Sequence, residues 1–299
     1  AADLWRLFVE NFTPDNLHWL ILVIVLVPVN WGLEALKWQQ LIRSFLDFSF
    51  WKTYQAILAG VAIGVFTPNR IGEYGGRILM VAPEYNWRAF VATLVGNFSQ
   101  FMVLVCFGLL GLIHFSSTFL ALEPYVLHIL LFLGLCCVLL MLFAFLNIDL
   151  LIPMVKRLPF ISFLKKYLKH LKVLTHYSSK QLVVTLLIAG VRYLVYTLQY
   201  YLMLRFFGID VPLLAGLSGI ATIYLLQTSI PLPPLVGLLA RGEVALYVWG
   251  FFSTAELNIL SASFTLFIIN LTIPALLGAV FIVKINVLKS LGYEKDKAD

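Results

Sequence analysis

The chain has 299 residues, of which 61% are hydrophobic and 12% are charged. Soluble domains average roughly 45–50% apolar and about 25% charged residues, so this composition excludes an ordinary soluble fold. The net charge of +6 comes from basic residues that flank apolar segments, and such a bias reports topology in a membrane protein. We therefore expect an all-α polytopic membrane protein that binds no nucleic acid.

Five apolar segments are long enough to cross a bilayer, because a hydrocarbon core of ~30 Å takes about 20 helical residues. These segments are residues 18–36, 89–113, 125–147, 181–205 and 258–283. Two other regions, 54–87 and 212–252, each hold two short apolar arms separated by Pro, Gly and charged residues. A helical arm of roughly 11–17 residues rises only about 17–25 Å, so neither region is expected to cross as an ordinary span.

The distribution of basic residues predicts the orientation of these segments. Lys and Arg concentrate in residues 37–53, in residues 148–180 and in the C-terminal tail, which the positive-inside rule places in the cytoplasm. The loops without Lys or Arg are 114–124, 206–212 and 253–257. Regions 54–87 and 212–252 then each start and end on one face of the membrane, and the two faces are opposite. This predicts two re-entrant helical hairpins around a protein-lined or water-filled centre.

The two halves of the chain match in inverted order, as in many transporters built from inverted repeats and broken helices. The single transmembrane domain divides into residues 1–113, residues 125–284 and a short cytoplasmic tail of 285–299. Span 125–147 has no counterpart in the first half, so we expect one more N-terminal span before residue 1. The amphipathic residues 1–17 would then correspond to residues 150–176.

Charged residues gather at the two hairpin breaks, which read TPNRIGEYGGR at 67–77 and PLPPLVGLLARGE at 231–243. A charge at membrane depth costs at least about 2.5–3.5 kcal/mol, so it usually pairs or serves a pathway. The planar fork of Arg suits carboxylate or phosphate. The candidate substrate-binding residues at the breaks are Asn69, Arg70, Glu73, Tyr74, Arg77, Arg241 and Glu243.

Two roles are open for these charged residues. In the first, the arginines contact an anionic headgroup, while Glu73 and Glu243 orient them, contact an amine or carry a proton. In the second, Arg70–Glu73 and Arg241–Glu243 are structural ion pairs that hold the hairpins together.

Further polar residues lie within the spans and share helix faces at a spacing of three. The candidates of this kind are Glu34, Lys37, Asn97, Gln100, Arg192 and Gln199. They either line a cavity or form hydrogen bonds between helices. The tryptophans at 19, 31, 38, 51 and 87 are typical of interfacial anchors. No metal-ligand spacing or nucleotide fingerprint appears, so we expect no catalytic residue, metal or cofactor.

Three segments resemble motifs of one family. TPNRIGEYGGR resembles the T-P-x-R-x-G-E-x-x-R element of the lysylphosphatidylglycerol synthase transmembrane-region family, also called flippase-like domain proteins. SIPLPPLVGLLARGE at 229–243 resembles that family's second, Pro-rich and Gly-rich element, and EALKW at 34–38 resembles its R-A-x-R-W element. The resemblance covers essentially the whole chain.

The chain also departs from the family pattern. Lys37 stands where the family usually has Arg, and the second element has fewer glycines and a longer spacing to Glu243. The soluble aminoacyl-transferase domain of some members is missing from this sequence, so we expect no synthesis of lysyl-lipid. The remaining part resembles the region credited with moving lipids between leaflets.

The primary hypothesis is therefore a flippase-like transporter, without enzymatic activity, for a membrane lipid with a phosphate-bearing or zwitterionic headgroup. The first alternative is a polyprenyl-phosphate-sugar flippase that serves glycan assembly, and the second is a membrane-embedded lipid-modifying enzyme. A further alternative is a non-transporting partner of a glycosyltransferase. We expect a bacterial inner-membrane location, with a lipid-headgroup synthase or a glycosyltransferase as candidate partner.

Overall fold

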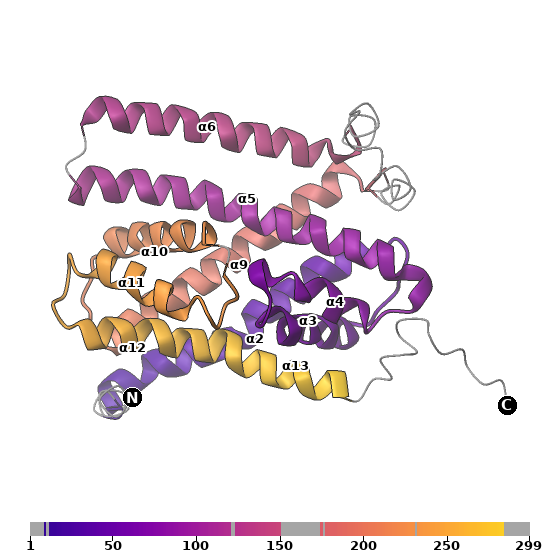
Figure 1. The fold of residues 1–299 in the computed structure, drawn as a ribbon, viewed down its shortest axis with the longest axis horizontal. Helices are drawn as coiled ribbons and strands as arrows, with labels where there is room; N and C mark the ends of the chain where they lie inside the picture. Colours follow the sequence, from indigo (N-terminus) through magenta and orange to yellow (C-terminus); the bar gives the residue numbers. More distant parts are fainter. Residues whose placement is uncertain are drawn as a thin grey trace.

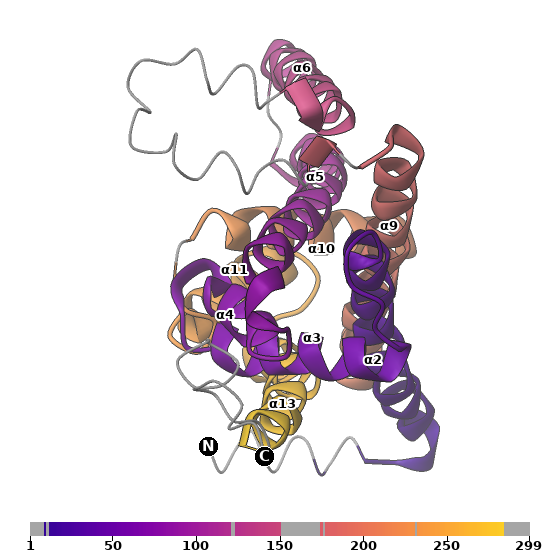
Figure 2. The ribbon, with the colours of Figure 1, turned by 90° about the vertical axis from the view of Figure 1, so that its right-hand side faces the viewer.

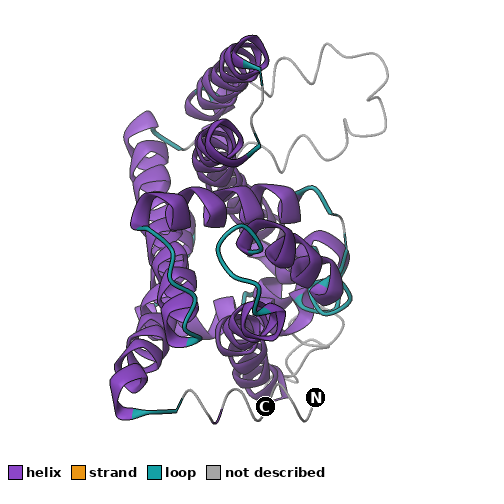
Figure 3. Ribbon diagram, turned by 90° about the vertical axis from the view of Figure 1, so that its left-hand side faces the viewer, coloured by secondary structure: helices purple, strands orange, loops and turns teal. Residues whose placement is uncertain are grey.

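The computed structural model describes residue 9 and residues 12–120, 123–150, 174–175, 177–230 and 232–283. Within these ranges the regular elements are all helices, joined by short loops (Figure 3). The prediction of an all-α polytopic membrane protein is confirmed by this architecture and by five helices that are long and apolar enough to cross a bilayer.

The long helices extend slightly past most of the predicted spans. They are α2 (Pro14–Ile42), α5 (Asn86–Phe119), α6 (Pro124–Leu146), α9 (Ser179–Phe206) and a composite of α12 (Glu256–Phe267), a π-helical segment (Ile268–Thr272) and α13 (Ile273–Val283). A helix satisfies its own backbone hydrogen bonds in lipid and in water alike. It can therefore continue through the polar residues that end an apolar run.

Each of the two interrupted regions holds a pair of short helices. The first pair is α3 (Phe50–Gly64) and α4 (Gly72–Ile78), and the second is α10 (Leu213–Thr228) and α11 (Leu238–Trp249). At 1.5 Å per residue these helices are about 10–24 Å long, which is less than a ~30 Å hydrocarbon core. Their orientation to the membrane as re-entrant hairpins, and the inverted repeat, stay predictions.

The short pairs occupy opposite ends of the molecule, and their breaks meet near its middle (Figure 1). Helix α3 packs on α4 and α13, and α10 packs on α5 and α11. Helices α2 and α9 run against each other along much of their length, whereas α6 contacts chiefly α5 and projects from the bundle (Figure 2). The arrangement places α2, α5, α9 and α12 around the two breaks.

Two tryptophans expected at the membrane interface lie inside the protein instead. Trp31 and Trp38 are 3% and 0% exposed, whereas Trp51 and Trp87 are 59% and 46% exposed. The two buried indoles find hydrogen-bond acceptors within the fold, at Asn270 O and Thr93 Oγ1, each 3.0 Å from the indole nitrogen. An indole with a partner can be buried without loss of its hydrogen bond, so the interfacial prediction is wrong for these two residues.

Glycines let the short helices approach their neighbours closely. A Cβ atom on Gly76 would lie 2.4 Å from the carbonyl oxygen of Ala59, and one on Gly278 would lie 1.9 Å from that of Leu58. Both contacts are between backbones, as is common where membrane helices pack through small residues. Helix α3 is thereby held tightly between α4 and α13.

Some predictions fall on residues outside the described ranges. These are most of the amphipathic segments 1–17 and 150–176, residues 151–173 and 176 of the basic loop 148–180, and the tail 285–299. The division into halves 1–113 and 125–284 likewise stays a prediction.

Candidate functional site

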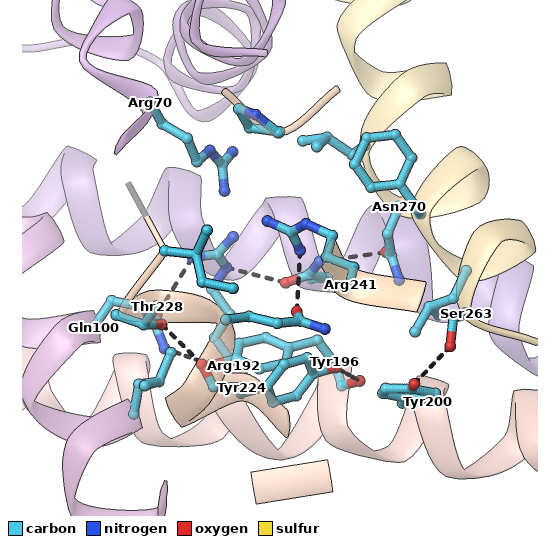
Figure 4. Close-up of a pocket in the computed structure, with 18 of the residues that line it drawn as sticks. Arg70, Gln100, Arg192, Tyr196, Tyr200, Tyr224, Thr228, Arg241, Ser263 and Asn270 are labelled. Carbon is cyan, nitrogen blue, oxygen red and sulfur yellow. Dashed lines mark hydrogen bonds between the residues drawn. The ribbon is translucent and has the colours of Figure 1, made fainter. Parts of the chain in front are cut away.

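A cavity of about 570 Å³ lies in the middle of the bundle, bordered by α2, α5, α9, α10, α11 and α12 (Figure 4). Both helix breaks reach it, the first through Asn69 and Arg70 and the second through Ile230, Leu232 and Pro234. Its volume lies in the range of roughly 300–1,000 Å³ that is typical of small-molecule sites. The cavity therefore joins the two interrupted regions that are far apart in the sequence.

Three arginines from three different elements converge on this cavity. The guanidinium carbons of Arg70 and Arg192 lie 5.7 and 5.1 Å from the ring centroid of Trp31, which also lines the cavity. Arg241 lies 5.9 Å from the ring of Phe267, and its charge interacts with that of Arg70. Aromatic faces attract these cations, but the like charges repel one another, so an anion between them would be favoured.

The loop geometry at the first break aims Arg70 toward the cavity. Asn69 and Arg70 have φ angles of 48° and 57°, which lie in the left-handed region. Such angles cost non-glycine residues energy and are found where the surrounding structure imposes them. Thr67 supports the turn, since its hydroxyl accepts a hydrogen bond of 2.7 Å from the backbone N–H of Gly72.

Glu34 is the centre of a buried ionic network behind the cavity wall. Its carboxylate lies 2.7 Å from Lys37 Nζ, 2.9 Å from Arg77 Nη2 and 2.8 Å from Arg192 Nη1. Arg77 also reaches Glu73, 3.4 Å away. Breaking a buried ion pair would leave an uncompensated charge, so Glu34 holds Arg192 in position at the cavity. The same carboxylate offsets the charges of Lys37 and Arg77 behind the cavity wall.

Helix spacing explains how these groups come together. Asn30, Glu34 and Lys37 lie three or four residues apart and so share one face of α2. Helix α9 packs along that face and brings Arg192, whose Nε donates to Asn30 Oδ1 at 3.0 Å. Arg77 lies on α4, next to Gly76.

Basic groups outnumber acidic groups in and behind the cavity. The region holds two carboxylates, Glu34 and Glu73, and five basic side chains, which are Lys37, Arg70, Arg77, Arg192 and Arg241. Arg70 pairs with Glu73 at 2.5 Å. Arg241 forms no ion pair with any described residue and donates instead to Gln227 Oε1 at 3.2 Å. The arrangement can therefore accept an anion, which would offset the surplus positive charge.

Hydroxyl groups form the other polar part of the cavity lining. Tyr200 and Ser263 share a hydrogen bond of 2.7 Å, and Trp249 Nε1 donates to the Tyr200 hydroxyl at 3.2 Å. The Tyr196 hydroxyl accepts from Gln100 Nε2 at 3.4 Å, and the Tyr224 hydroxyl donates to the backbone oxygen of Tyr196 at 3.1 Å. These groups are neutral and lie on α9, α10 and α12 (Figure 4).

The π-helical segment ties three of the helices together at the cavity. Asn270 donates from Nδ2 to Gln199 Oε1 at 3.0 Å, and its backbone oxygen accepts from Trp31. Asn30 Nδ2 lies 3.4 Å from Asn270 Oδ1. Segments of π-helix inside α-helices occur frequently at functional sites, and this one connects α2, α9 and the α12–α13 helix.

The residues proposed from the sequence fall into three places. Those that line the cavity are Asn69, Arg70, Gln100, Arg192 and Arg241. Those in the buried ionic network behind it are Glu34, Lys37, Glu73 and Arg77, and Gln199 is buried beside it and accepts from Asn270.

Three proposed residues lie away from the cavity. Tyr74 and Asn97 do not line the cavity, and the Tyr74 ring lies 4.9 Å from that of Phe90. Glu243 is exposed, and the guanidinium of Arg241 bonds to Gln227 rather than to this carboxylate. Residues two apart on a helix point in nearly opposite directions, which explains why Arg241 and Glu243 do not pair within α11.

Several lining residues were not proposed from the sequence. They are Trp31, Tyr200, Tyr224, Gln227, Ser263 and Asn270. Tyr200 could have been proposed from the helical spacing, since it lies four residues after Tyr196 and shares a helix face with it and with Arg192. No local pattern distinguishes Asn270 or Ser263 from other polar residues in apolar helices.

Comparison with known proteins identifies the family. No curated protein and no solved structure matches the chain. The sequence profile described as "Lysylphosphatidylglycerol synthase TM region" matches residues 4–278, which is most of the chain and includes both breaks and the cavity. The resemblance to this family is thereby confirmed, and the chain belongs to this family of flippase-like membrane proteins.

Proposed function

We propose that the protein moves a membrane lipid with a phosphate-bearing or zwitterionic headgroup between the leaflets of a bilayer. The headgroup passes through the central cavity, while the acyl chains stay in the surrounding lipid. The observation that carries this proposal is the convergence of three arginines on one cavity inside a bundle of membrane-spanning helices. The membrane is proposed to be a bacterial inner membrane.

The lining of the cavity suits an amphipathic molecule. Arginine, amide and hydroxyl groups share the wall with apolar side chains, among them Phe101, Leu104, Leu266 and Leu271. A headgroup can exchange its hydration for the polar groups, and the first carbons of the lipid can contact the apolar ones. The breaks between short helices lie beside this wall, where helices that end inside the bundle leave room for a headgroup.

A flipping assay in proteoliposomes tests the proposal. Purified protein is reconstituted with a trace of fluorescent phospholipid, and a membrane-impermeant quencher reports how fast the label leaves the inner leaflet. We expect rates at least about tenfold above protein-free vesicles, with the lipid recovered chemically unchanged. Rates equal to those of empty vesicles contradict the proposal, and a new lipid species indicates a lipid-modifying enzyme instead.

A pair of variants links the movement to the cavity. Arg241→Gln removes an arginine charge that no described carboxylate balances, and we expect at least a tenfold lower rate. Arg205→Gln is the matched control, because Arg205 lies at the end of α9 and pairs with the exposed Asp210. Equal rates in the two variants would show that the lipid takes another route.

A further inference from the structure

The positive part of the cavity is suited to a single phosphodiester. Arg70 and Arg192 flank Trp31, and Arg241 approaches from α11. Arg70 and Arg192 are each paired with a carboxylate, whereas Arg241 has only the amide of Gln227 among the described residues. Arg241 is therefore the arginine at the cavity whose charge no described carboxylate balances, and the charge of a phosphodiester can pair with it.

The neutral part of the cavity offers hydrogen-bond donors and acceptors that its own contacts leave unused. Two hydroxyl protons belong to the Tyr200–Ser263 pair, but only one can lie between the two oxygens. Gln227 accepts from Arg241 through Oε1, which leaves its NH₂ group without an acceptor among the described residues. The Tyr196 hydroxyl accepts from Gln100 and keeps its own proton to donate.

The cavity lining holds no carboxylate among the described residues. Glu34 is buried behind the wall and shared by three cations, Glu73 is paired with two arginines, and Glu243 lies elsewhere. An ammonium group has three donors and no acceptor. Placed here it would lack an ionic partner and would be repelled by the arginines.

From these observations we infer that the cavity selects an anionic phosphodiester whose alcohol carries free hydroxyls, and rejects a headgroup that bears an additional amine. Glycerol and sugar are alcohols of this kind, so the phosphodiester can come from a glycerophospholipid or from a polyprenyl-phosphate sugar. The inference rests on the proposed function and specifies its substrate. It also implies that an aminoacylated lipid such as lysylphosphatidylglycerol is not the preferred cargo.

Binding and movement are measured separately, so that this inference and the proposed function can fail independently. Binding is followed as the increase in Tm of the detergent-purified protein with each of four short-chain probes. The probes are phosphatidylglycerol, phosphatidylethanol, lysylphosphatidylglycerol and a polyprenyl-phosphate glucose. Phosphatidylethanol carries the same charge as phosphatidylglycerol and lacks the hydroxyls. Fluorescent forms of the same lipids then enter the flipping assay.

We expect phosphatidylglycerol, the polyprenyl-phosphate glucose or both to bind at least tenfold more tightly than phosphatidylethanol. A site that hydrogen-bonds a hydroxyl rejects analogues that lack it, because the site's polar groups are then left unpaired. Lysylphosphatidylglycerol is expected to bind no better than phosphatidylethanol. Which of the two hydroxyl-bearing lipids binds more tightly identifies the source of the headgroup.

Each other outcome has a definite meaning. Selective binding without movement supports the inference and contradicts the proposed function. Movement of all four lipids at similar rates with equal affinities supports the function and overturns the inference, as does a preference for lysylphosphatidylglycerol. Absence of both binding and movement overturns both.

Two serines on α12 provide a matched pair of variants. Ser263 lines the cavity, whereas Ser261 is 4% exposed, does not line it and has no hydrogen-bond partner among the described residues. Ser263→Ala should reduce the preference for phosphatidylglycerol over phosphatidylethanol to below about threefold and leave phosphatidylethanol binding unchanged. Ser261→Ala should keep the full preference. A preference that is unchanged in Ser263→Ala would remove this hydroxyl group from the site.

Discussion

Glu34 forms ion pairs with more basic side chains than any other described carboxylate. It is 2% exposed and contacts three cations on α2, α4 and α9. The desolvation of buried charges is compensated only when partners and hydrogen bonds surround them. Glu34 is therefore a positioning residue, which holds Arg192 at the cavity and does not itself line it.

We predict that Glu34→Gln destabilises the protein by about 3–5 kcal/mol, the usual cost of removing one partner from a buried ionic group. The substitution keeps the shape and leaves Lys37 and Arg192 without a carboxylate partner among the described residues, while Arg77 keeps Glu73. Thermal unfolding in detergent measures the effect as a lowered Tm. Glu84→Gln, at an exposed position, is the control and should leave the Tm unchanged. A Glu34→Gln protein with the parental Tm would refute this role.

A second prediction concerns the amide next to Arg241. Gln227→Glu places a carboxylate where Oε1 now accepts from this arginine at 3.2 Å, so the charge of Arg241 would be neutralised from within. We expect binding of anionic lipid to weaken at least tenfold, with little change in Tm. Titration of the purified variant with phosphatidylglycerol measures this change, and unaltered affinity would show that Arg241 does not contact the anion.

The short helices depend on backbone contact for their placement. Helix α4 has only seven residues, too few to be stable without its neighbours. Its packing against α3 places Glu73 and Arg77 where they meet Arg70 and Glu34. The position of the charged groups thus depends on how closely two short helices can approach.

Gly76→Ala tests this dependence, because the added Cβ would lie 2.4 Å from the Ala59 carbonyl oxygen. Backbone must move to accept it, and we predict a destabilisation of about 1–3 kcal/mol together with at least a tenfold loss of lipid movement. Gly75→Ala is the neighbouring control, since its Cβ would meet nothing within 4 Å. That variant should retain the parental Tm and flipping rate. Equal behaviour of the two variants would argue against the close packing of α3 and α4.

For the whole molecule, the sequence predicted what depends on local chemistry. Long apolar runs identified the five spanning helices, and Pro, Gly and charge identified the two breaks, because hydropathy and backbone breaking act within a few residues. The burial of Trp31 was not predictable in this way. It depends on a carbonyl of Asn270, which is 239 positions away and is reached only in the folded bundle. The hydroxyls of Tyr200 and Ser263 meet for the same reason.

The inverted, re-entrant topology is the remaining prediction at this scale, and cysteine labelling tests it. In a protein whose native cysteines at 106, 136 and 137 are replaced, single cysteines are introduced by Asp47→Cys, Glu84→Cys, Asp210→Cys and Glu256→Cys, all at exposed loop or helix-end positions. A region that dips into the membrane and returns keeps both of its flanks on one face. We therefore expect positions 47 and 84 to react with an impermeant maleimide from one face and positions 210 and 256 from the other.

If either region instead crossed the membrane an odd number of times, its two flanks would react from opposite faces. The cavity would then lie between ordinary spans, and the two halves would not be inverted copies.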